Sequence, residues 1–109
     1  MANPQGFDAV LELVVHMCEE LVDDSEALAI DGVYTGVTGA IEITGPSDEI
    51  AKIIGSKRAT ITALEVVMNA VAAKHGFRVL LNVMNTERKR HLEEGQLRND
   101  DVHRDEKDD

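Results

Sequence analysis

The chain has 109 residues, of which 43% are hydrophobic, 29% charged and only 3% aromatic, and its formal net charge at pH 7 is −10. This length supports one domain, and the apolar fraction excludes a wholly disordered chain. No apolar run approaches the roughly 20 residues that span a bilayer, and the first residues do not resemble a secretory signal, so we expect a cytoplasmic protein. The single cysteine, Cys18, excludes an internal disulfide and a cysteine-rich zinc site.

Charge is distributed unevenly along the chain. Residues 1–49 hold 11 acidic residues and no lysine or arginine, residues 50–92 hold eight basic and two acidic residues, and residues 93–109 hold eight acidic and three basic residues. Net acidity argues against a general polyanion binder, whereas a positive middle segment favours one surface that faces a polyanion. Charge alone does not decide between that surface and ordinary solvated faces.

The first half of the chain predicts one helix and two strands. Over residues 7–22 apolar side chains recur three and four positions apart, which is typical of an amphipathic helix. Residues 28–31 and 37–44 alternate apolar and polar side chains, which predicts two strands with one buried face each. A hairpin is expected between them, near Tyr34-Thr35-Gly36.

The second half predicts two helices and a third strand. Ser47 is the expected N-cap of a short helix that Gly55 ends. An apolar stripe over residues 61–72 predicts a longer helix that begins near Ala59, and residues 77–84 predict a strand. Three strands and three helices in this order predict an α+β two-layer sandwich, with a three-stranded sheet and the helices on one face.

The composition changes after the third predicted strand. We expect one domain over residues 1–84, followed by a polar extension with a helical pattern over residues 85–98. Residues 99–109 are rich in aspartate and poor in apolar side chains, so we expect an acidic disordered tail there.

The junction between the last two predicted helices is the one local feature with a chemical mechanism. The first backbone N–H groups of the second helix, near Ala59 and Thr60, have no helical acceptor, and the helix dipole adds positive potential. Such a helix start binds anions, and Lys57 and Arg58 place two cations beside it. A phosphate group of a nucleic acid is the natural occupant.

Other kinds of site have weaker support. The four histidines show no metal-ligand spacing, and no hydroxyl or thiol is accompanied by a placed histidine, as nucleophilic catalysis requires. The chain contains neither a P-loop nor a Gly-x-Gly-x-x-Gly motif. We therefore expect no catalytic residue, no metal and no cofactor.

The stretch Lys52-Ile-Ile-Gly-Ser-Lys-Arg-Ala-Thr-Ile-Thr-Ala-Leu64, with the later segments at residues 70–76 and 78–83, resembles the K-homology (KH) domain. The resemblance covers residues 8 to about 84 and is nearest to the small single-domain bacterial KH proteins and the KH module of Jag-type proteins. It implies a type II KH-like fold with the order α-β-β-α-α-β. Members of this family bind single-stranded RNA through a Gly-x-x-Gly loop, and some are described as RNA chaperones.

The resemblance implies weak, non-enzymatic binding of single-stranded RNA with little sequence specificity. No aromatic side chain lies along this stretch to stack on bases. Ile53, Ile54 and Ile61 are expected to line the base-facing groove, while the loop binds phosphate. The expected RNA-binding residues are Lys52, Ile53, Ile54, Gly55, Ser56, Lys57, Arg58, Ala59, Thr60 and Ile61.

Arg58 stands where the family loop has its second glycine. Its side chain either obstructs the close approach that glycine allows or replaces lost backbone contacts by pairing directly with phosphate, and the sequence leaves both open. The alternative function is that of a degenerate KH fold without RNA binding. Such a fold would act as a protein-interaction or dimerisation module, either as a homodimer or with a larger KH-protein partner.

Overall fold

The computed structural model describes residues 5–36 and 38–95. The element order confirms the predicted fold class, while residues 96–98 of the predicted extension and the predicted tail at 99–109 lie outside the described residues. Residues 86–95 form a further helix after the last strand. The preceding elements are α1 (Gln5–Leu21), the 3₁₀ turn η1 (Ser25–Ala27), β1 (Ala29–Thr35), β2 (Thr38–Gly45), α2 (Ser47–Ile54), the 3₁₀ turn η2 (Ser56–Arg58), α3 (Ala59–Lys74) and β3 (Arg78–Asn85).

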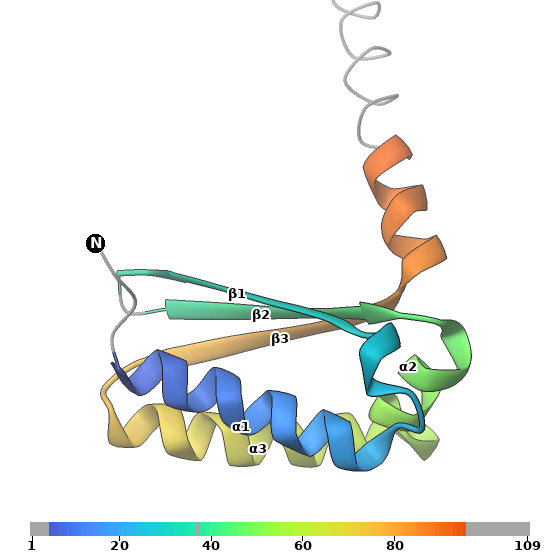
Figure 1. Cartoon of the computed structure of the whole chain (residues 1–109). Coiled ribbons are helices and arrows are strands. Elements are labelled where there is room, and N and C mark those ends of the chain that lie inside the picture. Colours follow the sequence, from blue (N-terminus) through green and yellow to red (C-terminus); the bar gives the residue numbers. More distant parts are fainter. Residues whose placement is uncertain (1–4, 37, 96–109) are drawn as a thin grey trace, which may run out of the picture.

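The three strands form one mixed sheet in the order β1-β2-β3. β1 and β2 are antiparallel, whereas β2 and β3 are parallel, with Gly45 opposite Asn85. A parallel pair needs a crossover connection, and α2 and α3 provide it. Figure 1 shows α1 and α3 side by side against one face of the sheet, which confirms the two-layer sandwich.

An almost entirely apolar core fills the space between the sheet and the helices. Core residues recur every three or four positions along α1 and every four positions along α3, because each helix presents one apolar side to the sheet. Burying one such side chain fully stabilises the fold by about 1.5–3 kcal/mol. The core residues are Phe7, Val10, Val14, Cys18, Val22, Ile41, Ile43, Ile50, Ile53, Leu64, Met68, Ala72, Phe77 and Val79.

All three aromatic residues of the chain meet at one end of this core. The ring centroids lie 5.6 Å apart for Phe7 and Tyr34, 6.2 Å for Phe7 and Phe77, and 5.4 Å for Tyr34 and Phe77, distances at which such pairs attract. A Cβ at Gly39 would lie 2.5 Å from the Phe7 ring, so the glycine makes room for it. This end, where α1 begins, is opposite to α2 in Figure 1.

Two local predictions need correction. β1 and β2 form the expected hairpin, but Tyr34 and Thr35 belong to β1 and not to the turn, because Thr35 pairs directly with Thr38. Ser47 is the first residue of α2 and not its N-cap; the cap is Pro46, which makes no side-chain cap bond. The carbonyl oxygen of Pro46 accepts the N–H groups of the helix start, and the proline ring holds the extended conformation that precedes it.

Among the described residues, no helix is both long enough and apolar enough to cross a membrane.

Candidate nucleic-acid interface

The turn between α2 and α3 is built on Gly55. Its backbone, at φ 78° and ψ 170°, lies in a region that only glycine adopts readily, and its N–H donates to the Ala51 carbonyl oxygen at 2.9 Å. A Cβ added here would overlap the Thr60 hydroxyl oxygen. The predicted helix end at Gly55 is therefore confirmed, and the glycine is required both by its conformation and by the space it leaves.

Two successive cations follow in the left-handed conformation. Lys57 has φ 54° and ψ 30°, and Arg58 has φ 63° and ψ 22°; among the described residues they are the only non-glycine positions with positive φ. This conformation costs a residue that has a Cβ roughly 1–2 kcal/mol. Both residues are exposed, and within residues 5–36 and 38–95 neither pairs with an acidic side chain. The turn therefore presents two uncompensated positive charges to solvent.

The backbone donors of the turn differ from those the sequence predicts. Ala59 donates its N–H to the Ser56 carbonyl oxygen, and Arg58 donates its N–H to that of Gly55 at 3.2 Å, so hydrogen bonds between residues three positions apart close the turn despite its left-handed backbone. The Ala59 amide, expected to hold phosphate, is therefore already used. Within the described part of the chain, the N–H groups of Ser56 and Lys57 have no acceptor. Two open donors thus lie just before Ala59 in the chain.

The apolar residues assigned to a base-facing groove are mostly inside the protein. Ile53 has no exposed surface and Ile61 retains 2%, because the apolar sides of α2 and α3 pack inward. Ile54 packs against the core but stays partly exposed. Of the three isoleucines, only Ile54 presents appreciable surface to a ligand.

Lys52 takes part in an ion-pair network. Its ammonium group lies 2.7 Å from Asp23 Oδ2 and 2.8 Å from Glu49 Oε1. Glu49 is only 5% exposed and also accepts the backbone N–H groups of Asp23, at 3.2 Å, and Asp24, at 2.7 Å. The Lys52 hydrogen bond and these two amides hold the pKa of Glu49 below its usual value.

This network joins α2 to the connection that follows α1, and it was missed from the sequence. Asp23 and Glu49 are 26 positions apart, and a glutamate in the first turn of a helix suggests only a favourable dipole contact. Contacts with Asp23 first, and with Glu49, raise the pKa of Lys52. Lys52 is thus charged and already paired with two carboxylates of the chain, in a position predicted to contact RNA.

The helix at residues 86–95 is attached at its start. Asn85 Oδ1 accepts the Arg88 backbone N–H at 2.6 Å, as an N-cap residue does, and Lys89 Nζ lies 2.7 Å from Glu42 Oε1 of β2. The pairing with Glu42 raises the pKa of Lys89. Figure 1 shows this helix, in orange, projecting away from the face of the sheet that carries α1 and α3.

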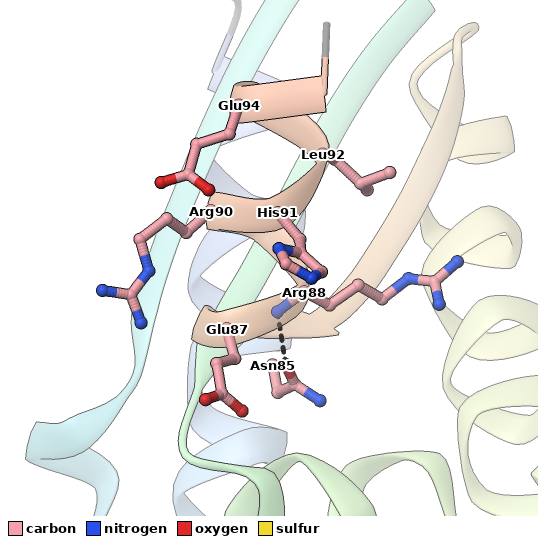
Figure 2. A pocket seen from close by; sticks show the side chains of 7 residues that line it. All are labelled: Asn85, Glu87, Arg88, Arg90, His91, Leu92 and Glu94. Atoms are coloured by element: carbon pink, nitrogen blue, oxygen red, sulfur yellow. Dashed lines mark hydrogen bonds between the residues drawn. The ribbon is translucent and has the colours of Figure 1, made fainter. Parts of the chain in front are cut away.

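A shallow pocket lies along this helix, but the geometry of the pocket does not suit ligand binding. All seven lining residues belong to the single segment 85–94. In Figure 2 Arg88 and Leu92 point to one side, whereas Arg90 and Glu94 point to the other, and among the described residues no other element contributes a lining side chain. Elsewhere among the described residues, no three histidine, cysteine, aspartate or glutamate side chains gather as a metal site would require.

Comparison with known proteins identifies the fold around this turn. The family described as "KhpA/KhpB, KH domain" matches residues 11–83. The RNA-binding protein KhpA of Chlamydia pneumoniae is 32% identical over 73 residues, which are 67% of this chain and 94% of that protein. The RNA-binding protein KhpA of Aquifex aeolicus (strain VF5) is 28% identical over 76 residues, which are 70% of this chain and 96% of that protein. The matched region ends before the helix at residues 86–95.

Proposed function

The chain belongs to the KhpA/KhpB KH-domain family, and from this membership we propose that it binds single-stranded RNA through the turn at residues 55–58, without a catalytic step. Two relatives of nearly the same domain length are named RNA-binding proteins. The observation that carries the proposal is the exposed turn itself, in which, among the residues that the structure describes, two cations have no acidic partner and two N–H groups have no acceptor. A phosphate group satisfies both requirements at once.

Arg58 acts in this proposal as a direct phosphate contact. Its side chain is exposed, and its guanidinium group can present two parallel N–H donors to phosphate oxygens. Lys57 adds a second charge, and the open N–H groups of Ser56 and Lys57 complete the contact. Gly55 holds the backbone in the required path, while Ile53 and Ile61 support the turn from the core.

Binding is expected to be weak and to carry little sequence information. The net charge of −10 opposes the approach of a polyanion, so affinity depends on the local charge of the turn. The three aromatic rings are packed together at the end of the domain opposite to α2, so none can stack on bases near the turn. Sequence-tolerant binding of this kind suits an RNA chaperone in the bacterial cytoplasm.

The test is a fluorescence-anisotropy titration of a labelled single-stranded RNA of random sequence at several salt concentrations. Replacing Lys57 and Arg58 together by glutamine should weaken binding. It should also flatten the slope of log affinity against log salt by roughly 1.4, since each phosphate contact to a single strand contributes about 0.7. Lys74→Gln, at the exposed far end of α3, is the matched control for a lost charge. The proposal fails if Lys74→Gln weakens binding as much per charge as the loop variant does.

A second copy of the chain is the partner that the outer face of α3 favours. This face carries no charge and is exposed; Val66 keeps 65% of its surface and Val67 keeps 45%. A helix that is apolar on both sides usually has both sides covered. The face consists of Thr62, Ala63, Val66, Val67, Ala70 and Ala73.

Self-association through this face also fits the charge of the chain. Two copies with a net charge of −10 repel each other, and the repulsion is least where an uncharged face meets itself. Val66→Asp should convert a dimer to a monomer in sedimentation equilibrium, while Val33→Asp, on the exposed face of β1, should leave the mass unchanged. A monomeric wild-type chain at high micromolar concentration would refute the homodimer without affecting the RNA proposal.

A further inference from the structure

We propose that Asp23 sets the affinity of the turn for RNA by competing with phosphate for the ammonium group of Lys52. This inference rests on the proposed function, because it assigns to the same site a third cation and an internal competitor. The two carboxylates that hold Lys52 differ in burial. Phosphate can replace the exposed carboxylate of Asp23, whereas it cannot replace the buried carboxylate of Glu49.

Glu49 is the permanent partner of Lys52. Its side chain is only 7% exposed, and its two oxygens also accept the N–H groups of Asp23 and Asp24. Removing Lys52 from it would leave a buried carboxylate with amide partners alone, which is unfavourable. Glu49 therefore keeps the lysine near α2 in both the free and the bound protein.

Asp23 is the exchangeable partner. Its side chain is 87% exposed, and the Lys52 side chain is 37% exposed, so water and ions reach the contact between them. Ion pairs in such positions contribute little to stability and are screened by salt. A phosphate group can therefore take the place of the Asp23 carboxylate without breaking the contact with Glu49.

The position of Lys52 suits this exchange. It lies on α2 three residues before Gly55, about 4.5 Å along the helix axis, and its flexible stem lets the ammonium group turn toward an RNA backbone held at the turn. In the free protein Glu49 and Asp23 together outweigh its charge. When phosphate displaces Asp23, Lys52 becomes the third cation of the interface, after Lys57 and Arg58.

The experiment is a double-mutant cycle on RNA binding, with the same random-sequence RNA and salt series. Asp23→Asn leaves the Asp23 backbone N–H bond to Glu49 in place and should tighten binding by about two- to fivefold, as expected for loss of an exposed competing pair. Asp24→Asn is the matched control, because it removes the same charge one residue away from a side chain that does not contact Lys52. It should change the affinity much less.

Lys52→Met supplies the other side of the cycle. It should weaken binding, lower the salt slope by about 0.7 and abolish the effect of Asp23→Asn. Circular-dichroism melting of each variant shows that it remains folded, and Lys52→Gln is the substitute if the methionine variant does not. Equal gains from Asp23→Asn and Asp24→Asn, or a gain from Asp23→Asn that persists without Lys52, would overturn the exchange. Those results would leave the RNA proposal intact, whereas RNA binding insensitive to Lys57 and Arg58 refutes the proposed function itself.

Discussion

Replacing Arg58 by glycine should make the protein more stable while it weakens RNA binding. The backbone at this position is left-handed, with φ 63° and ψ 22°, which costs arginine roughly 1–2 kcal/mol. Glycine adopts the same conformation without this cost. It also increases the conformational entropy of the unfolded chain, which lowers the free energy of unfolding by about 0.4–1 kcal/mol. The net gain is centred near 0.8 kcal/mol, which for a domain of this size raises the melting temperature by about 3–6 °C.

The assay combines thermal melting by circular dichroism with the RNA titration. Ser56→Gly is the control for stability, since Ser56 lies in the same turn without a positive φ and should lose about 0.4–1 kcal/mol when replaced by glycine. Arg58→Lys is the control for binding, because it keeps the charge. In the titration Arg58→Gly should reduce the salt slope by about 0.7.

Two results would refute this reasoning separately. A melting temperature that falls for Arg58→Gly as it does for Ser56→Gly shows that Arg58 does not hold a left-handed backbone. Tighter RNA binding by Arg58→Gly shows that the arginine obstructs the phosphate path and does not contact it.

Four further outcomes follow from the described contacts. Gly55→Ala should destabilise the fold by about 1–3 kcal/mol in urea denaturation, because alanine is strained at this φ and ψ and meets a neighbouring hydroxyl; a change below 0.5 kcal/mol, the size of an ordinary surface substitution, contradicts this. The pKa of Glu49 is lowered in the fold, so its carboxylate should stabilise the protein at pH values above its usual pKa of 4.5. This stabilisation should be lost as the pH falls below that value. Thermal melts of Glu49→Gln from pH 7 to pH 3 should therefore fall less steeply than those of wild type, and parallel curves would exclude the role. Asn85→Ala should remove an N-cap worth about 1 kcal/mol to the helix at residues 86–95, which hydrogen exchange should detect as faster exchange there and unchanged exchange in the sheet. Burial raises the pKa of the Cys18 thiol to about 11, so iodoacetamide at pH 8 should modify it only after denaturation, and rapid labelling of the folded protein would contradict its burial.

The parts of the fold that depend on local pattern could be predicted from the sequence. Apolar periodicity located the three helices and three strands, and Gly55 marked the end of α2 because glycine is the residue that tolerates its backbone conformation. The α-β-β-α-α-β order then limited the architecture, since a parallel third strand requires the helical crossover that precedes it.

The site could be predicted only in outline, because its details depend on contacts between distant segments. Nothing in the neighbourhood of Glu49 indicates that it accepts two amides 25 and 26 positions away, and this contact decides how Lys52 is held. Arginine seldom adopts a left-handed backbone, so the conformation of Arg58 was equally hidden. The burial of Ile61 could have been predicted from the sequence, because this residue lies one turn before Leu64 on the inner stripe of α3. The N-cap role of Asn85 could also have been predicted, because this residue lies directly before a polar helical pattern.

The clustering of every aromatic ring at the far end of the domain gives the protein a built-in optical reporter. With no tryptophan in the chain, ultraviolet emission comes from Tyr34, which is packed between Phe7 and Phe77. The fluorophore is remote from the cationic turn, so its signal follows the opening of the core and not contacts made at residues 55–58. Denaturation can therefore be followed with unlabelled protein in the presence of RNA, and a shift of the transition midpoint then measures binding through its linkage to folding.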